Sequence, residues 1–385
     1  MKFINRAVLQ HVQNRLECGQ VVLLLGARRV GKTELLRRVE QEFEGKTLFI
    51  NSETVNAQLL FEPRTAEHYR KTFSSFDLVL IDEVQELPNA AKNLKLLVDE
   101  VPSVRVLASG SAPIGVREIG EPLVGRSKVL YMYPLAYGEI AAHENPLQIQ
   151  ANLEERLIYG SYPRVWQLSH YTDKAEYLDN LVSSLLLKDV LSIGGVRHSS
   201  KLIDLLRLIA FQVGQEVSLP ELSRQIGIDK NTTERYLDLL QKVFVIIKRQ
   251  GFSRNLRKEI AKSSRWYFLD NGIMNTIVQN FRPLSVREDV GRLWENYCVA
   301  ERLKFHAYSR RMFVNSYFWR TYDQQEIDIV EEEGIATGGL AAFECKWSPT
   351  AKHSTPKAWK EAYPNVPLQV IHRENYSEFF SLPDT

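Results

Sequence analysis

The chain has 385 residues, of which 44% are hydrophobic and 25% charged, and its formal net charge is +2. This length and composition predict a globular protein of two to four domains, and the charge neither requires nor excludes nucleic acid. Its three cysteines are far apart and lack CxxC spacing, so they suggest neither a disulfide framework nor a zinc site. No apolar stretch approaches the roughly 20 residues that a membrane span requires, so we expect a cytoplasmic protein with no membrane segment.

The first predicted elements enclose an octapeptide that fits the pattern GxxxxGK[ST]. The run Val21–Leu25 is apolar and predicts a buried strand, while residues 32–43 carry apolar side chains at helical spacing. A strand before the motif and a helix after it are the context that a phosphate-binding loop requires. The predicted loop consists of Gly26, Ala27, Arg28, Arg29, Val30, Gly31, Lys32 and Thr33.

The residue types in this loop suit a nucleoside triphosphate. Gly26 and Gly31 allow backbone amides to surround the phosphates, and the amino terminus of the following helix adds partial positive charge. We expect Lys32 to contact the β- and γ-phosphates and Thr33 to hold Mg²⁺.

Two carboxylates follow the next long apolar run. Thr47–Asn51 predicts a short strand, and residues 77–83 predict a buried strand that ends in Asp82 and Glu83, the Walker B pattern. Asp82 is expected to bind Mg²⁺ through its water shell, and Glu83 to polarise the attacking water. Adjacent acids at the end of a strand can also serve only as a helix cap or turn.

A further strand, predicted at residues 104–108, is followed by Ser109 and Ser111. ATPases of the AAA+ type place a polar sensor of the γ-phosphate here, although a serine-rich turn would look the same. Residues 113–125 then predict a helix, and residues 128–132 another strand. Arg126 stands between them, where AAA+ modules carry an arginine finger that acts on the nucleotide of a neighbouring subunit. Its alternative is an ion pair with a surface acid.

Long segments of this module resemble a widespread bacterial and archaeal family of AAA+-like ATPases that carry a carboxy-terminal domain of unknown function. The resemblance rests on GARRVGKTELLRRVE at 26–40, DLVLIDEVQELPN at 77–89, ASGSAP at 108–113 and LVGRSKVLYMYPLAYGEI at 123–140, with later landmarks at 159–165 and 185–190. It implies ATP binding and hydrolysis with Mg²⁺, and the finger implies a homo-oligomer.

The middle of the chain predicts a helical connector and then a winged helix-turn-helix. Residues 153–191 have a helical pattern, and a helix at 201–212 precedes two helices joined by a glycine-containing turn and a strand at 245–248. The second of the joined helices offers Lys230, Asn231, Thr232 and Arg235 at its amino end, and the wing adds Lys248, Arg249, Arg254, Arg257 and Lys258. Binding of double-stranded or branched DNA is one interpretation, and a module for packing and protein contact is the other.

The last hundred residues predict a helix, three strands and a set of acids. Strand alternation places Glu326 and Asp328 on one face of a strand, and Glu344 and Lys346 on one face of the next. Two carboxylates would bind Mg²⁺, and Lys346 would orient a nucleophile beside a scissile phosphate. Glu295, on the preceding helix, would complete the metal ligands. A solvated strand face with alternating charges would give the same pattern.

The order of these elements, over roughly residues 285–375, resembles the PD-(D/E)xK nuclease superfamily, in which some members lose catalysis. We therefore predict an α/β chain: an AAA+-like P-loop core at 1–143, a helical lid or connector at 144–200, a winged helix-turn-helix at 201–282 and a PD-(D/E)xK-like domain at 283–385. Two functions stay open. One is ATP-driven DNA binding or processing, and the other is a nucleotide-controlled switch that binds a protein partner and does not cut.

Overall fold

The computed structural model describes residues 4–111, 123–184, 190, 199–253, 264–309, 313–334 and 339–383, and the chain divides into two compact units at Leu135 and Ala136. The predicted boundaries at 143, 200 and 282 remain predictions. Three sequence features lie wholly or mainly outside the described residues: the helix at 113–125, the landmark at 185–190, and the basic residues Arg254, Arg257 and Lys258.

The first unit is built on a five-stranded parallel sheet with the strand order β2-β3-β4-β1-β5. Every residue of β1 and β3 is buried, as expected of apolar strands that are covered on both faces. The sheet confirms the predicted parallel α/β architecture of this unit. Its strands are β1 (Val21–Leu25), β2 (Thr47–Asn51), β3 (Leu78–Asp82), β4 (Arg105–Gly110) and β5 (Ser127–Tyr131).

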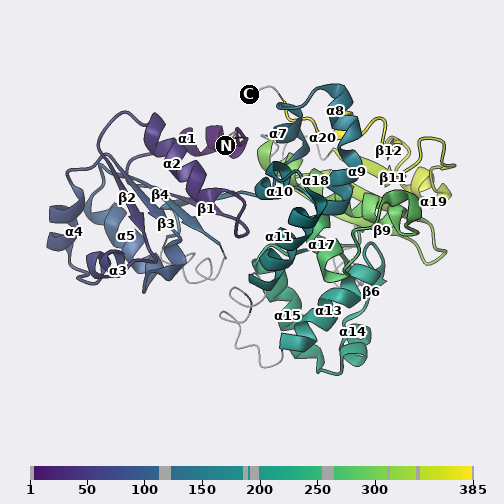
Figure 1. Cartoon of the computed structure of the whole chain (residues 1–385), viewed down its shortest axis with the longest axis horizontal. Helices are drawn as coiled ribbons and strands as arrows, with labels where there is room; N and C mark the ends of the chain where they lie inside the picture. The colour runs from purple at the N-terminus through teal and green to yellow at the C-terminus, as the bar shows by residue number, and fades with distance from the viewer. Residues whose placement is uncertain are drawn as a thin grey trace. The chain divides into compact units, whose positions relative to one another are not determined.

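Helices cover both faces of this sheet (Figure 1). Apolar side chains of α3, α4 and α5 form one core with alternate residues of β1, β3 and β4, and α1 and α2 lie together on the other side. Threonine side chains cap α3 and α4 by accepting backbone amide protons. The helices are α1 (Val8–Gln13), α2 (Lys32–Glu42), α3 (Val55–Phe61), α4 (Ala66–Phe73) and α5 (Ala90–Glu100), with a 3-10 turn η1 at Val84–Glu86.

Parallel pairing brings the carboxyl ends of three strands to one edge of the sheet. Leu25, at the end of β1, pairs with Gly110, and Ile81 of β3 pairs with Ala108 of β4. The loop after β1, the end of β3 and the last residues of β4 therefore lie at this edge. Gly26 must be glycine at this edge, because a Cβ would lie 2.0 Å from the carbonyl oxygen of Met132. The sheet therefore gathers the three predicted nucleotide motifs.

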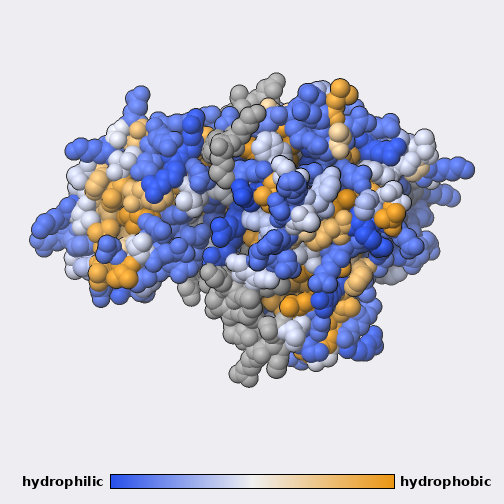
Figure 2. Space-filling view, viewed as in Figure 1, coloured by the Kyte–Doolittle hydropathy of each residue, from blue (hydrophilic) through white to orange (hydrophobic). Residues whose placement is uncertain are grey.

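Figure 2 shows apolar side chains among hydrophilic ones on the visible face of the first unit, both in the middle of the unit and over α3. Val55 and Leu59 are 69% and 56% exposed, and they lie one helical turn apart. A patch of two side chains is ordinary for a protein surface and by itself defines no interface.

The second unit begins with five described helices, of which α9 and α11 pack against the later helix α17. The chain reverses at Gly160, whose φ of +75° is open mainly to glycine, and Asp270 then accepts hydrogen bonds from the amides of Ser161 and Gly272. The landmark at 159–165 is thus a docking point for the amino terminus of α17. The helices are α7 (Tyr137–Ala141), α8 (Pro146–Ala151), α9 (Leu153–Tyr159), α10 (Pro163–Gln167), α11 (Tyr171–Ser184) and α17 (Asn271–Ile277).

Three helices and a three-stranded antiparallel sheet follow in the order α13-β6-α14-α15-β7-β8, with β8 in the middle of the sheet. Gly227 ends α14 in the left-handed conformation, and the side chain of Asp229 caps α15 by accepting from the amide of Thr232. The elements are α13 (Ser199–Phe211), β6 (Glu216–Val217), α14 (Leu219–Ile226), α15 (Lys230–Lys242), β7 (Ile246–Gln250) and β8 (Ser264–Phe268).

The chain ends in a four-stranded mixed sheet with the order β12-β11-β10-β9. A bridge between Gly251 and Phe318 and a core that includes Phe252, Trp319 and Trp359 join this sheet to the three-stranded one. Its elements are α18 (Val290–Tyr308), β9 (Val314–Arg320), β10 (Glu326–Glu333), β11 (Leu340–Cys345), α19 (Lys357–Ala362), β12 (Leu368–Ile371) and α20 (Ser377–Phe380), after a 3-10 turn η3 at Leu284–Val286. Among the described helices, none is long and apolar enough to cross a membrane.

Gly160→Ala should destabilise the second unit by at least about 2 kcal/mol. A Cβ at this position would meet the Asp270 carboxylate at 2.0 Å, in addition to the strain of the positive φ. Gly291→Ala is the matched control, because nothing lies within 4 Å of its Cβ and it stands in a helix. Denaturant unfolding measures both, and equal stability of the two variants would contradict the assignment.

Candidate active site

The phosphate-binding loop is closed by its own lysine. Gly31 has a φ of +100° and Arg29 a φ of 64°, so the backbone turns sharply between β1 and α2. Lys32 is 4% exposed, and its Nζ donates to the carbonyl oxygens of Gly26 and Ala27, each at 2.9 Å. The ammonium is thereby held against the loop in which phosphates are expected.

The Asp82 carboxylate joins three elements at this edge of the sheet. Thr33 Oγ1, on α2, donates to Asp82 Oδ2 at 2.8 Å, and Ser109 Oγ, on β4, donates to Asp82 Oδ1. Asp82 itself is 5% exposed. The structure thus brings together three residues that were predicted from separate sequence motifs. The first and last of them, Thr33 and Ser109, are 76 positions apart in the chain.

Glu83 stands beside this carboxylate in a left-handed backbone conformation, with φ 51°. Its amide donates to Ser109 Oγ at 3.1 Å, and its carboxylate accepts from Gln85 Nε2 at 2.5 Å. Gln85 Nε2 also donates to Ser111 Oγ at 3.0 Å. Gln85 therefore links the predicted water-polarising acid to the second serine, and no motif marks it in the sequence.

Arg6, like Gln85, is a residue of the site that no sequence motif predicted. Its guanidinium is buried and donates to the carbonyl oxygen of Val30 at 2.5 Å and to that of Tyr133 at 2.6 Å. It ties the backbone of the phosphate-binding loop to the segment after β5. Arg6 lies in a polar amino-terminal stretch with no pattern that would single it out.

The oxygen donors at this edge fit Mg²⁺ bound together with a nucleotide. Mg²⁺ in such sites takes few protein ligands and receives the rest from phosphate and water. Thr33 supplies a hydroxyl and Asp82 a carboxylate, already joined by a hydrogen bond. These two residues are the ones that would hold the ion.

Arg126 lies at the opposite edge of the sheet. Its carbonyl accepts from the amide of Val21, the first residue of β1, whereas the phosphate-binding loop follows the last. Its Nε is 2.5 Å from Asp99 Oδ1, and its side chain is 41% exposed. The structure shows the surface ion pair that was the alternative interpretation, and a role in a neighbouring subunit's site stays a prediction.

The four residues predicted to contact DNA lie in the first two turns of α15. Lys230, Asn231 and Arg235 are exposed, and Thr232 is half-buried. Thr233 is buried instead and bonds to Ser223 of α14. The exposed side of this helix end is therefore polar and carries two basic residues, while contact with DNA stays a prediction.

A second group of charged residues gathers in the second unit, around Arg265 of β8. Arg265 is 3% exposed and lies 2.6 Å from Glu326, and 3.8 Å from both Glu295 and Asp328. Tyr267 donates its hydroxyl proton to Glu295 at 2.7 Å. The structure brings the predicted acids of α18 and β10 together, and it adds Arg265 and Tyr267, which no motif in the sequence indicates.

The remaining two predicted residues of this centre form a pair of their own. Lys346 Nζ is 2.7 Å from Glu344 Oε1, and Glu344 Oε2 is buried with no hydrogen-bond partner among the residues that the structure describes. The amide of Cys345 donates to Asp328 Oδ2 at 2.8 Å, which ties the end of β11 to β10. Lys346 itself follows the last residue of β11.

Burial and mutual repulsion perturb the acids of this centre. Burial is the main reason that the pKa of Asp328 lies well above its usual range, and the nearby carboxylates of Glu295 and Glu344 raise it further. Burial also raises the pKa of Glu295 to about 7, although Arg265 and the Tyr267 hydroxyl oppose the shift. The acids thus outnumber the positive charges available to them.

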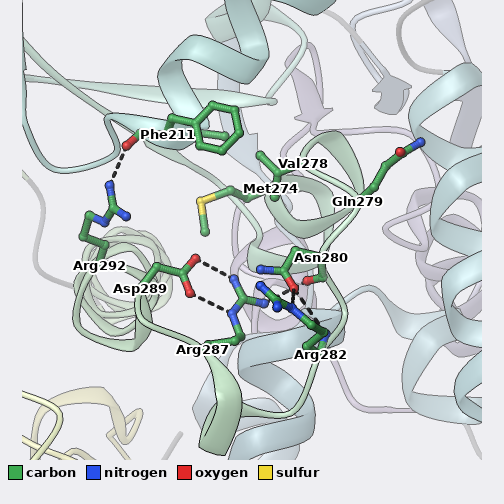
Figure 3. Close-up of a pocket in the computed structure, with 10 residues that line it drawn as sticks. Phe211, Met274, Val278, Gln279, Asn280, Arg282, Arg287, Asp289 and Arg292 are labelled. Carbon is green, nitrogen blue, oxygen red and sulfur yellow. Dashed lines mark hydrogen bonds and ion pairs between the residues drawn. The ribbon is translucent and has the colours of Figure 1, made fainter.

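A hollow of about 310 Å³ lies elsewhere in the second unit, beside α13 and α17 (Figure 3). Arg287 is buried, pairs with Asp289 at 2.7 Å, and also donates to Asn280 and Asn275. Because its donors are used in this way, Arg287 stabilises the segment before α18. The hollow is lined by Ala210, Phe211, Met274, Val278, Gln279, Asn280, Arg282, Arg287, Asp289 and Arg292.

Family models match three successive parts of the chain. Residues 19–141 match the AAA domain, residues 150–284 match a domain of unknown function (DUF8612), and residues 290–379 match another (DUF4143). With the sheet and the loop, the first match shows an AAA-type P-loop ATPase fold in the first unit. The last match agrees with the expected carboxy-terminal domain of unknown function.

Proteins similar to most of this chain occur in bacteria and archaea. An uncharacterized protein of Mycobacterium tuberculosis is 27% identical over 350 residues, which cover 90% of this chain and 74% of that protein. One of Methanocaldococcus jannaschii is 22% identical, covering 82% and 71%. Among solved structures, a signal transduction ATPase with numerous domains from Pyrococcus horikoshii is 12% identical, with a TM-score of 0.30, and is covered over 45% of its length. A TM-score this low supports no inference.

The stability of Glu295→Gln relative to the wild type should increase as the pH rises. The folded pKa of Glu295 is raised to about 7, so its contribution to stability is fully present below its ordinary pKa and is lost as the pH rises through 7. Denaturant unfolding at about pH 5 and about pH 8 measures the difference between variant and wild type. The same difference at both pH values would contradict the raised pKa.

Proposed function

We propose that the first unit binds ATP with Mg²⁺ and hydrolyses it. The observation that carries this proposal is the Asp82 carboxylate, which accepts from Thr33 of the phosphate-binding loop and from Ser109 of the neighbouring strand. Such an arrangement couples the metal-binding hydroxyl to a residue placed to sense the γ-phosphate.

Each residue has one role in this proposal. The amides of the loop 26–33 and the Lys32 ammonium bind the phosphates, and Thr33 and Asp82 hold the metal. Mg²⁺, when bound, neutralises charge on the phosphates during transfer. Glu83 accepts a hydrogen bond from the attacking water, in addition to the 2.5 Å bond that its Oε2 accepts from Gln85. Ser109 and Ser111 respond to the γ-phosphate.

Hydrolysis in this proposal takes place in a homo-oligomer. Arg126 lies at the sheet edge opposite its own phosphate-binding loop, so a catalytic role for it requires a second copy of the chain. To act, it would leave its exposed ion pair with Asp99, and such pairs are weak in water.

For the second unit we propose DNA binding controlled by nucleotide state. The order α13-β6-α14-α15-β7-β8, with β8 between β6 and β7, supports the winged helix-turn-helix interpretation. The exposed Lys230, Asn231 and Arg235 at the amino end of α15 support contact with duplex DNA from this helix.

The second candidate function is a switch in which the nuclease-like domain does not cut. The order α18-β9-β10-β11-α19-β12 supports the PD-(D/E)xK interpretation of the fold. However, Arg265 lies among the acids that would have to bind Mg²⁺. This observation argues against cleavage and favours the nucleotide-controlled switch, in which the domain binds a protein partner.

Lys32→Ala should weaken ATP binding at least tenfold, whereas Glu83→Gln should keep ATP affinity and lower turnover by about a hundredfold or more. The first removes the phosphate contact and the second only the group that polarises water. Equilibrium binding and phosphate release measure the two effects. Glu86→Gln is the control, because Glu86 is exposed three residues further on and should keep full turnover. ATPase activity that persists in both variants would refute the assignment.

Lys230→Glu and Arg235→Glu should each weaken binding to duplex DNA at least tenfold and lower its dependence on salt, because each removes a positive charge that contacts phosphate. Lys242→Glu carries the same charge change at the other end of α15, where Lys242 pairs with Asp238, and should bind normally. Fluorescence anisotropy at several salt concentrations measures the affinities. Equal losses in all three variants would show a general charge effect and no site on this helix.

A further inference from the structure

The acids predicted to bind metal in the second unit are arranged around an arginine. The guanidinium of Arg265 is within 4 Å of Glu295, Glu326 and Asp328, which come from a helix and a strand outside its own sheet. The Nη1 atom of Arg265 is 3.8 Å from Oε1 of Glu295 and also 3.8 Å from Oδ1 of Asp328. The space between these two acids is therefore occupied by a cation that belongs to the chain.

Strand β8 fixes this arginine in place. Residues 265 and 267 are two apart on the strand and share a face, so Arg265 and Tyr267 both reach Glu295. The guanidinium also lies over the ring of Phe318, 4.6 Å from its centre, and only 3% of the residue is exposed. A side chain packed in this way does not leave the centre by a change of rotamer alone.

A divalent ion finds no suitable set of ligands among the residues that the structure describes. Mg²⁺ requires oxygen ligands at about 2.1 Å in octahedral geometry. No group of three or more His, Cys, Asp or Glu residues in the described ranges is placed to hold a metal ion. Asp328 Oδ2 already accepts from the amide of Cys345, and Glu344 Oε1 is paired with Lys346. The acids predicted as ligands therefore do not fit the metal as they stand.

We propose that the guanidinium of Arg265 is the built-in cation of this carboxylate centre and excludes divalent metal ions from it. The centre is then a junction that joins β8 of the three-stranded sheet to α18 and β10 by charge. The proposal involves neither the phosphate-binding loop nor α15, so it stands or falls independently of ATP hydrolysis and of DNA binding by that helix.

Arg265→Met tests the proposal, with Mn²⁺ as the probe and the full chain as the sample. Without the arginine, the acids repel one another, and the variant should melt at a lower temperature than the wild type. It should gain one Mn²⁺ per chain, bound at least tenfold more tightly than by the wild type, and Mn²⁺ should raise its melting temperature. Any Mn²⁺ held at the phosphate-binding loop is common to both proteins and cancels in the comparison.

Two control variants separate this effect from a general loss of packing. Arg265→Lys keeps a positive charge and should gain no Mn²⁺. Arg265→Met combined with Asp328→Asn removes one of the acids and should lose the gained ion, with a melting temperature closer to that of the wild type. A folded Arg265→Met variant, judged by circular dichroism, that binds no additional Mn²⁺ would overturn the proposal.

A measurement on the wild type decides the question if Arg265→Met does not fold. Crystals of the wild-type chain soaked in Mn²⁺ should give no anomalous scattering peak among Glu295, Asp328 and Glu344. A peak at that position would show that the metal and the arginine coexist, and the proposal would be wrong.

Discussion

The Asp82 carboxylate is the contact on which the nucleotide site depends. It is buried at the end of β3, and it holds the first turn of α2 and the end of β4 through two hydroxyl donors. A buried carboxylate is stable only with such partners, so the position of each element constrains the others. Arg6 and Gln85 extend the same network, one to the backbone of the loop and one to Glu83 and Ser111.

The residues of this network that belong to sequence motifs, such as Thr33, Asp82 and Ser109, could be predicted because they lie at or after the ends of apolar strands. Runs such as Val21–Leu25 locate the strands, and parallel pairing then brings whatever follows them to one edge. Arg6, Gln85 and Arg265 could not be predicted in this way, since their partners lie at positions set by tertiary packing. The position of Arg126 relative to the sheet was predictable, but its ion pair with Asp99 was not.

The second unit shows the same division between local pattern and tertiary contact. The sequence predicted α14, α15, α18 and the strands β9 to β11, but not β8, which carries Arg265. Strand alternation placed Glu326 and Asp328 on one face, where both are within 4 Å of Arg265. It did not predict that an arginine from another sheet would lie among the acids, or that Gly160 is required because the Asp270 carboxylate approaches its backbone. Charged groups in this unit therefore hold its helices and strands together.

The central claim is that Thr33 and Asp82 together form the metal-binding half of an ATP site. The direct test is the affinity for ATP with and without Mg²⁺, measured by isothermal titration for the wild type, Thr33→Ala and Asp82→Asn. The account predicts that Mg²⁺ tightens binding to the wild type at least tenfold, and that either substitution removes most of this gain while metal-free binding stays similar. A gain of the same size in all three proteins would contradict it.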